Sequence, residues 1–444
     1  MIDNMRDGDG QSQPENAQRV DWEDQMIVRT ATATFVASAL LAGSAAAQEL
    51  TLWSHWADQQ AKVDFVENAA RAFEEANPGV SIEIVWYQKQ PLYAALKTAL
   101  TAGQGPDIFY AEADQVEYMQ NNLILDLSDR LNWDAIEPWA QDVWGYEGGV
   151  YGFPLEAWTV ETYVDEAKLA EAGVDVPVAG LQGQAFVDAV ATLAEAGITP
   201  MAQGTGDRPY PGAFLTHEIL LKKLGTEDYE ALLRGEGVEW TDPRVREGLE
   251  YAKAIIDAGA FPRSISSIKL GEAHRYFHTD PGAAMFQMGS FYPSRAFADP
   301  DAGGQPEDFA LGITNGPIPD DAACPTCKTI AVGGSFVVNA GSDHADLAAA
   351  FLNSMATPER GNAWLEANLV GTGIKADPSS ITGENADYFA DLAATNEGAT
   401  YTFGIPVQQM QGQARETFNQ VVNGAFPAGL IDVDGVIDMM SAAY

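Results

Sequence analysis

The chain has 444 residues and carries 24 basic and 64 acidic side chains, a formal net charge of −40. A field of this sign repels nucleic acid and anionic membranes, so we expect neither as a partner. It also disfavours anionic ligands, although a local basic pocket can override the average, and high acidity by itself is a common route to solubility. After the N-terminal region no apolar run approaches the roughly 20 residues that span a bilayer, so we expect no membrane insertion.

The N-terminal region contains a short apolar run that has the layout of a secretory signal peptide. Residues 26–47 combine one basic residue (Arg29), a short apolar core and a terminus of three alanines. We expect cleavage before Gln48 and a periplasmic protein. Residues 1–25 are polar and acidic, and we interpret them as a non-native extension that precedes the true initiator. Removing 1–47 leaves about 397 residues, enough for two or three lobes, with a net charge near −36.

The first part of the mature chain alternates between strand and helix patterns. Val63, Val66, Ala70 and Phe73 recur at three- and four-residue spacing, as on one face of a helix, and Asn77–Gly79 ends it. The alternation predicts a βαβαβ unit, an α/β fold with a parallel sheet and helices on its faces. The expected elements are a strand at 50–56, a helix over 63–73, a strand at 80–87, a helix at 91–101 and a strand at 105–114.

The same pattern resumes later in the chain. Asp242 followed by Pro243 is typical of a helix start, and that helix is expected to run to Gly259. The stretch 299–328 is rich in Pro, Gly and Asp and is expected to be loop. The other expected elements are a helix at 185–196 ended by Gly197, and strands at 198–204, 282–288 and 334–341.

Aromatic and acidic residues recur where the predicted strands end. In open parallel sheets ligands bind outside the carboxyl ends of the strands, so these residues are candidates for a binding site. The ends carry Trp53–Trp56, Trp86–Tyr87, Tyr110–Glu112, Glu156 and Trp158. Sugar rings stack on aromatic rings, and their hydroxyls pair with carboxylates in charge-assisted hydrogen bonds. The pattern therefore favours a neutral polyhydroxylated ligand, although core packing explains any single aromatic equally well.

Catalytic motifs are sparse. His274 and His278 lie four apart, but Arg275 stands where a zinc protease of the HExxH type needs Glu, so that interpretation fails. A bare two-histidine metal site remains an alternative, and a surface or packing role is favoured. No nucleophile elbow, phosphate loop or dinucleotide fingerprint is present. We expect no catalytic residue, no metal and no cofactor. Paired glycosidase carboxylates are not singled out by sequence, so an exported glycosidase or lyase remains an alternative.

The two cysteines form the motif CPTC, Cys324 to Cys327. A redox pair would precede a helix whose N-terminus activates the thiolate, but a strand-like stretch follows here. In an oxidising compartment a small structural disulfide is the favoured interpretation.

The order of these segments resembles that of the family 1 extracellular solute-binding proteins, which include maltose-binding protein and its relatives that serve carbohydrate ABC importers. The resemblance covers the mature chain and rests on LTLWSHW, FEEANPGVSIEI, GPDIFYAEA, YGFPLEAWTVETYVDEAKLAEAG, GAAMFQMGSFYPSRAF and AVGGSFVVNAGSDHADLAAAFLNSMATPE. It implies two discontinuous α/β lobes joined by three crossing segments, with the ligand in the cleft. The implied boundaries are lobe one at 48–157 plus 286–337, lobe two at 160–283 plus 343–444, and hinges near 157–160, 283–285 and 337–342.

The resemblance also implies a set of ligand contacts. Phe291 departs from the family pattern, because it stands where relatives have a stacking tryptophan. Gln408 is a weaker candidate near the C-terminus. The implied ligand-binding residues are Ser54, Trp56, Asp58, Tyr110, Glu112, Asp114, Glu156, Asp207, Tyr210, Phe291, Gly334 and Gln411.

The sequence thus predicts a monomeric periplasmic protein without catalytic activity. It would close around a neutral carbohydrate and deliver it to the permease subunits of an ABC importer. A polyol, compatible solute, peptide or amine remains an alternative ligand, since His55 and an acid-rich cleft also suit a cation.

Overall fold

The computed structural model describes residues 48–57, 59–113, 115–206, 214–297, 299–383, 386–410 and 412–444. The predicted signal peptide at 26–47 and the extension at 1–25 lie outside these residues. Within the described ranges, every helix is too short or too polar to cross a membrane.

The first sheet contains the predicted βαβαβ unit. Its strand order is β2-β1-β3-β14-β6. β1 (Gln48–Ser54) runs parallel to both β2 (Val80–Trp86) and β3 (Ile108–Ala111). β14 (Ser335–Val338) pairs antiparallel with β3 and with β6 (Phe153–Pro154). The three predicted strands are therefore confirmed, and they leave their carboxyl ends at one edge of the sheet.

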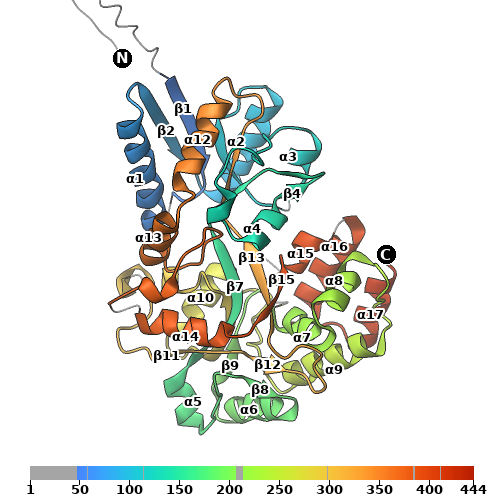
Figure 1. Ribbon diagram of the computed structural model, residues 1–444. Helices are drawn as coiled ribbons and strands as arrows, with labels where there is room; N and C mark the ends of the chain where they lie inside the picture. The colour runs from blue at the N-terminus through green and yellow to red at the C-terminus, as the bar shows by residue number, and fades with distance from the viewer. Residues whose placement is uncertain are drawn as a thin grey trace, which may run out of the picture. The chain divides into compact units, whose positions relative to one another are not determined.

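Helices from both halves of the chain cover this sheet. α1 (Gln60–Ala76) buries Val63, Val66, Ala70 and Phe73, the residues whose spacing predicted it. α12 (Ala345–Met355) and α13 (Pro358–Asn368) lie beside α1, although almost 300 residues separate them in the sequence (Figure 1). The remaining elements of this region are α2 (Lys89–Thr101), α3 (Glu117–Gln120), η1 (Trp133–Ala135), α4 (Pro138–Val143), β4 (Gly145–Tyr146) and β5 (Gly149–Val150).

The second sheet is mixed, and its strand order is β15-β13-β7-β10-β9, with β11 also paired to β7. β7 (Ala157–Asp165) is central and buried along nearly its whole length. It pairs antiparallel with three strands, and parallel pairs form the edges. The other strands are β9 (Thr199–Ala202), β10 (Ala283–Gly289), β11 (Leu311–Thr314), β13 (Cys327–Val332) and β15 (Thr400–Phe403).

The two helices that the sequence predicted in the region of the second sheet, α6 and α9, begin within a residue of where they were expected. α9 starts at Pro243, and the side chain of Asp242 accepts a hydrogen bond from the backbone N–H of Arg244, as an N-cap does. The elements of this region are α5 (Glu166–Ala172), β8 (Leu181–Gln182), α6 (Gln184–Glu195), α7 (Phe214–Leu224), α8 (Thr226–Arg234), α9 (Pro243–Asp257), α10 (Leu270–His278), α11 (Pro293–Ala296), η3 (Pro300–Ala302), β12 (Pro317–Ile318), η4 (Pro378–Ser380), α14 (Ala386–Asn396), α15 (Pro406–Gln409), α16 (Gly412–Gln420), η5 (Val421–Ala425) and α17 (Val433–Ser441).

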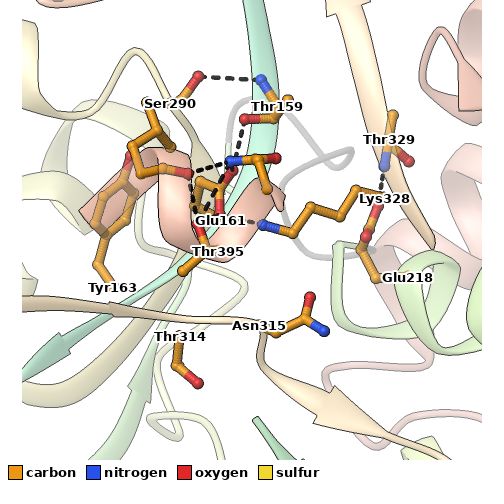
Figure 2. Close-up of polar contacts among 12 residues, drawn as sticks. Thr159, Glu161, Tyr163, Glu218, Ser290, Thr314, Asn315, Lys328, Thr329 and Thr395 are labelled. Carbon is orange, nitrogen blue, oxygen red and sulfur yellow. Dashed lines mark hydrogen bonds and ion pairs between the residues drawn. The ribbon is translucent and has the colours of Figure 1, made fainter. Parts of the chain in front are cut away.

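A buried polar cluster ties helices to this sheet (Figure 2). Glu161 on β7 and Lys328 on β13 form an ion pair at 2.6 Å, with side chains only 0% and 2% exposed. Thr395 on α14 donates to the same carboxylate at 3.3 Å. Glu218 on α7 accepts from the backbone N–H of Thr329 at 3.2 Å. Buried charges are tolerated only when they are paired in this way, so the cluster fixes the positions of both helices against β13 and β7.

The cysteines form the expected disulfide between Cys324 and Cys327, at the start of β13. The surrounding stretch 299–328 is less irregular than expected, because it contains β11 and β12.

Sheet membership corrects the expected lobe boundaries. Residues 286–332 belong with the second sheet, because β10 continues past residue 285 and pairs with β7 as far as Gly289–Val160. Conversely, α12 and α13 pack with α1 of the first sheet. The expected hinges at 283–285 and 337–342 therefore fall at ends of strands within single sheets. The chain passes between the sheets at 155–156 and at 333–334, and again between α13 and α14.

Candidate functional site

A cavity of about 510 Å³ is lined by residues from both sheets and their helices. Cavities of this size are typical of sites for small molecules. The first region, which is the first sheet with its helices, contributes the starts of α1 and α2 and the end of β3. The second region, which is the second sheet with its helices, contributes α11, α15 and α16. The lining residues include His55, Trp56, Gln59, Lys62, Gln88, Lys89, Gln90, Tyr93, Tyr110, Glu112, Glu156, Trp158, Leu270, Phe291, Ser294, Arg295, Val332, Gly333, Ile405, Gln408, Arg415 and Asn419.

The connecting segments between the sheets lie side by side next to this cavity. The backbone N–H of Glu156 donates to the carbonyl of Gly334 at 2.8 Å, and that of Gly333 donates back to the carbonyl of Glu156 at 2.8 Å. Ala157 donates to the carbonyl of Gly371 at 3.0 Å. A Cβ on Gly333 would lie 2.7 Å from a carboxylate oxygen of Glu156, and one on Gly371 would lie 2.7 Å from the carbonyl of Ala157. Glycine is required at 371 because the backbone of Ala157 approaches so closely, whereas at 333 a Cβ would force the Glu156 carboxylate to shift.

A buried ion pair lies against these segments. Lys62, in the first turn of α1, binds the carboxylate of Glu156, and the two residues are only 5% and 9% exposed. The ammonium also lies 5.3 Å from the ring centre of Trp56. Burial lowers the pKa of Lys62, and Arg295 and Lys89 lower it further, although Glu156 opposes the shift. Lys62 is thus paired with one carboxylate, while two other basic side chains act on it from nearby.

A second carboxylate is saturated with hydrogen bonds. Glu112, which follows β3, binds Lys89 and accepts from the hydroxyls of Tyr93 at 2.8 Å and Tyr110 at 2.9 Å. Burial raises the pKa of Glu112, but Lys89 and the two tyrosines outweigh it and keep the pKa below its usual value. Glu112 is therefore a stable carboxylate at neutral pH. Burial, together with the nearby Glu112 charge, raises the pKa of Tyr110, which stays protonated and donates.

Aromatic rings form the apolar wall. Trp158 on β7 meets Phe291 edge to face, with ring centres 5.4 Å apart. The guanidinium of Arg295 lies 6.0 Å from the centre of the Phe291 ring. In the part of the lining that the first sheet and its helices contribute, the ring centres of His55 and Tyr110 are 4.1 Å apart. Rings beside N–H and O–H donors are suited to a ligand that has both an apolar face and polar groups.

The cavity collects five of the predicted binding residues, which are Trp56, Tyr110, Glu112, Glu156 and Phe291. Ser54 does not line it, because its side chain is fully buried at the end of β1, and this expectation is corrected. Gly334 packs against the buried ring of Trp56 and likewise does not line it: a Cβ there would lie 2.3 Å from Cζ2. Asp58, Asp114, Asp207, Tyr210 and Gln411 lie outside the described residues.

Sequence reasoning missed the basic residues of the cavity, which are Lys62, Lys89, Arg295 and Arg415. The first two lie in the opening turns of helices that follow strand ends, and such turns face the same edge of a parallel sheet. That rule identified the strand ends, but it applies equally to the helix starts beside them. Arg295 and Arg415 lie on short helices of the second region and had no comparable signal.

His274 and His278 do not line the cavity. His278 bonds the hydroxyl of Tyr292 at 2.8 Å and the carbonyl of Gly303 at 3.2 Å, so both ring nitrogens have protein partners. His274 is buried and lies 5.9 Å from Phe291, ring over ring. Burial lowers the pKa of His274 well below its usual value, which keeps the ring neutral. Both rings are buried, so of the surface and packing roles that the sequence favoured, packing is the one that their positions fit. In the part of the chain described, no three His, Cys, Asp or Glu side chains gather as a metal site would need.

Comparison with known proteins identifies the family. Residues 68–414 match the family described as bacterial extracellular solute-binding protein. This match covers more than three quarters of the chain.

The chain is a bacterial extracellular solute-binding protein. Solved structures show that it has the two-lobed fold of such proteins. A structure reported with xylan utilization by Caldanaerobius polysaccharolyticus superposes with a TM-score of 0.74 at 21% identity, over 89% of this chain and 99% of that one. A chitin oligosaccharide binding protein superposes with a TM-score of 0.72 at 19% identity, over 88% of this chain and 97% of that one. The apo-form of RafE from Streptococcus pneumoniae gives 0.67 at 18% identity, over 90% and 99%.

Curated relatives of this solute-binding protein match over shorter stretches. The lactose-binding protein of Rhizobium radiobacter is 28% identical over 156 residues, which are 34% of this chain and 36% of that protein. The maltotriose-binding protein of Pyrococcus abyssi is 32% identical over 94 residues, which are 20% and 21%. The alignments therefore span about a third and a fifth of these relatives.

Proposed function

We propose that this solute-binding protein captures a carbohydrate in the cavity and delivers it unaltered to the permease of an ABC importer. The observation that carries the proposal is a single cavity lined from both sheets by aromatic rings and hydrogen-bonding side chains. Relatives named for lactose, maltotriose and chitin oligosaccharide support a carbohydrate as the ligand.

Capture would work by hinge closure. The proposed first lobe comprises 48–154 and 335–370, and the second comprises 157–332 and 377–444. Groups from both lobes reach one ligand together only in the closed state, so ligand binding favours closure. A dissociation constant of about 1 µM corresponds to a binding free energy near −8 kcal/mol. Several hydrogen bonds and ring contacts can supply this free energy after the cost of association is subtracted.

The state of the carboxylates supports binding without chemistry. A glycosidase needs two carboxyl groups flanking the bond, one of them an acid with a raised pKa. Among the described residues that line the cavity, the carboxylates are Glu112 and Glu156. Each is bound to a lysine, and the pKa of Glu112 is lowered rather than raised. Neither is arranged as a general acid. We further propose a monomer that is exported to the periplasm by the signal peptide at 26–47.

A thermal-shift screen against neutral and acidic sugars, polyols, compatible solutes and amines tests the proposal. A ligand at 100 times its dissociation constant adds about 2.7 kcal/mol to the free energy of unfolding, which raises the melting temperature measurably. A response only to non-carbohydrates would refute the proposal. Chromatography of the bound sugar should return it intact, and cleavage products would support the enzyme instead.

A pair of aromatic substitutions links binding to the cavity. Phe291→Ala removes a ring from the apolar wall and should weaken sugar affinity measured by calorimetry at least tenfold. Tyr146→Ala is the matched control, because Tyr146 packs against Tyr151 on the β4–β5 hairpin and does not line the cavity. Equal effects of the two substitutions would show that the ligand binds elsewhere.

A further inference from the structure

Among the described residues that line the cavity, basic side chains outnumber acidic ones, whereas the whole chain is strongly acidic. The described lining contains four basic side chains and two acidic ones. In the complete sequence the balance is 24 basic to 64 acidic residues. The described lining is therefore locally basic, and such a pocket can override an acidic average.

The two acidic side chains are already engaged by the protein. Glu156 binds Lys62, and both oxygens of Glu112 accept hydrogen bonds from Lys89, Tyr93 and Tyr110. Ligand hydroxyl groups would normally donate to such carboxylates. Both oxygens of Glu112 and one oxygen of Glu156 are thus taken up by protein donors. Each lysine has three N–H donors and each arginine five, so N–H donors outnumber the remaining carboxylate acceptor among the described charged groups of the cavity. Donors of positive charge select a ligand that has acceptors of negative charge.

The basic residues come in pairs from the two regions. Lys62 and Lys89 stand at the starts of α1 and α2, whereas Arg295 and Arg415 stand on α11 and α16. All four line the same cavity, and Lys62, Lys89 and Arg295 lie close enough to interact, since Arg295 and Lys89 both contribute to the lowered pKa of Lys62. Closure would bring these like charges nearer and is therefore opposed when no ligand is bound.

We propose that the ligand is an anionic carbohydrate, whose negative group binds between the arginines of the second lobe and the lysines of the first. The inference rests on the proposed carbohydrate-binding function and revises the expectation of a neutral sugar. A guanidinium has five N–H donors, so it can hold a protein partner and a ligand anion together. An anion in the cavity neutralises the repulsion that opposes closure, which couples ligand charge to lobe closure. A carboxylate of a uronic acid and a phosphate ester share this chemistry.

Calorimetry with charge-matched sugar pairs tests the inference. One arm compares trigalacturonate with its methyl ester, and a second compares glucose 6-phosphate with glucose; lactose and maltotriose serve as neutral references. We expect the anionic member of one pair to bind at least tenfold more tightly than its neutral partner, and to weaken as salt is added. The arm that responds identifies the anion as carboxylate or phosphate.

The outcomes separate the two proposals. If a neutral sugar binds and neither anionic member binds more tightly than its partner, the anionic inference is wrong and carbohydrate binding stands. If no sugar in either arm or among the references binds, the proposed function itself fails and the inference fails with it.

A substitution assigns the effect to the basic residues. Arg415→Gln should weaken binding of the anionic sugar about 10- to 100-fold, because it removes a hydrogen bond to a charged group. It should weaken binding of the neutral partner sugar by less than about threefold. Arg246→Gln removes the same charge from an exposed pair with Asp434 and is the control. Equal losses for both sugars would overturn the assignment. Should Arg415→Gln fold poorly, Arg295→Gln at an exposed position serves the same comparison.

Discussion

Glu156→Gln should destabilise the protein, because it leaves Lys62 buried without its carboxylate. The side chains of the pair are only 12% and 6% exposed, and breaking a buried pair in this way costs roughly 3–5 kcal/mol. The cost has a ceiling, because Lys62 can release its proton instead. Starting from an ordinary pKa of 10.5, that release costs about 5 kcal/mol at pH 7, at about 1.4 kcal/mol per pH unit. We expect a loss of about 3 kcal/mol at pH 7.

The same reasoning predicts how the loss depends on pH. In the variant the folded-state pKa of Lys62 falls further below 10.5, so the folded state binds fewer protons than the unfolded state as pH rises. Stability then increases with pH in this window. At pH 9.5 the ceiling is only about 1.4 kcal/mol, so the loss should shrink to about 1 kcal/mol. Urea unfolding followed by tryptophan fluorescence at both pH values measures the difference.

Two comparisons make the result decisive. Asp346→Asn breaks the ion pair with Arg130, in which the Asp346 side chain is 89% exposed, and should cost less than about 1 kcal/mol at either pH. Adding Lys62→Met to Glu156→Gln removes the stranded charge and should restore most of the stability. A loss for Glu156→Gln below about 0.5 kcal/mol, or one that does not shrink at pH 9.5, would refute the argument.

Three further substitutions address packing and electrostatics elsewhere. Replacing Cys324 and Cys327 by Ser opens a four-residue loop and should cost about 2 kcal/mol in urea unfolding, and an unchanged midpoint would show that the bond contributes nothing. Gly334→Ala places a Cβ 2.3 Å from the buried ring of Trp56, so we expect the free energy of unfolding to fall by about 1–3 kcal/mol and ligand affinity to weaken. Unchanged stability and affinity would show that the ring moves aside. Burial lowers the pKa of Lys222 to about 8, so wild-type stability should rise with pH from about 8 to 10 and Lys222→Met should lack this rise; parallel profiles would contradict it.

Much of the local structure was readable from the sequence. The spacing of Val63, Val66, Ala70 and Phe73 predicted α1, and Asp242–Pro243 located the start of α9. The strand-end rule brought Tyr110, Glu112 and Glu156 to one place, as the cavity confirms. These signals succeed because the periodicity of a helix or strand depends only on about ten to twenty neighbouring residues.

The sequence by itself determined the first strand–helix alternation, the starts of two later helices, the family and the aromatic character of the site. The tertiary structure alone decided where the chain crosses between lobes, because β10 pairs with a strand about 120 residues earlier. It also decided that Lys62 meets Glu156 across 94 residues, and that Arg415 faces the same cavity. Such contacts depend on which strands become neighbours, and strand order is set by packing of the whole sheet rather than by any local pattern. Such packing also brought together, among the described residues of the cavity, more basic than acidic side chains in a chain that is acidic overall.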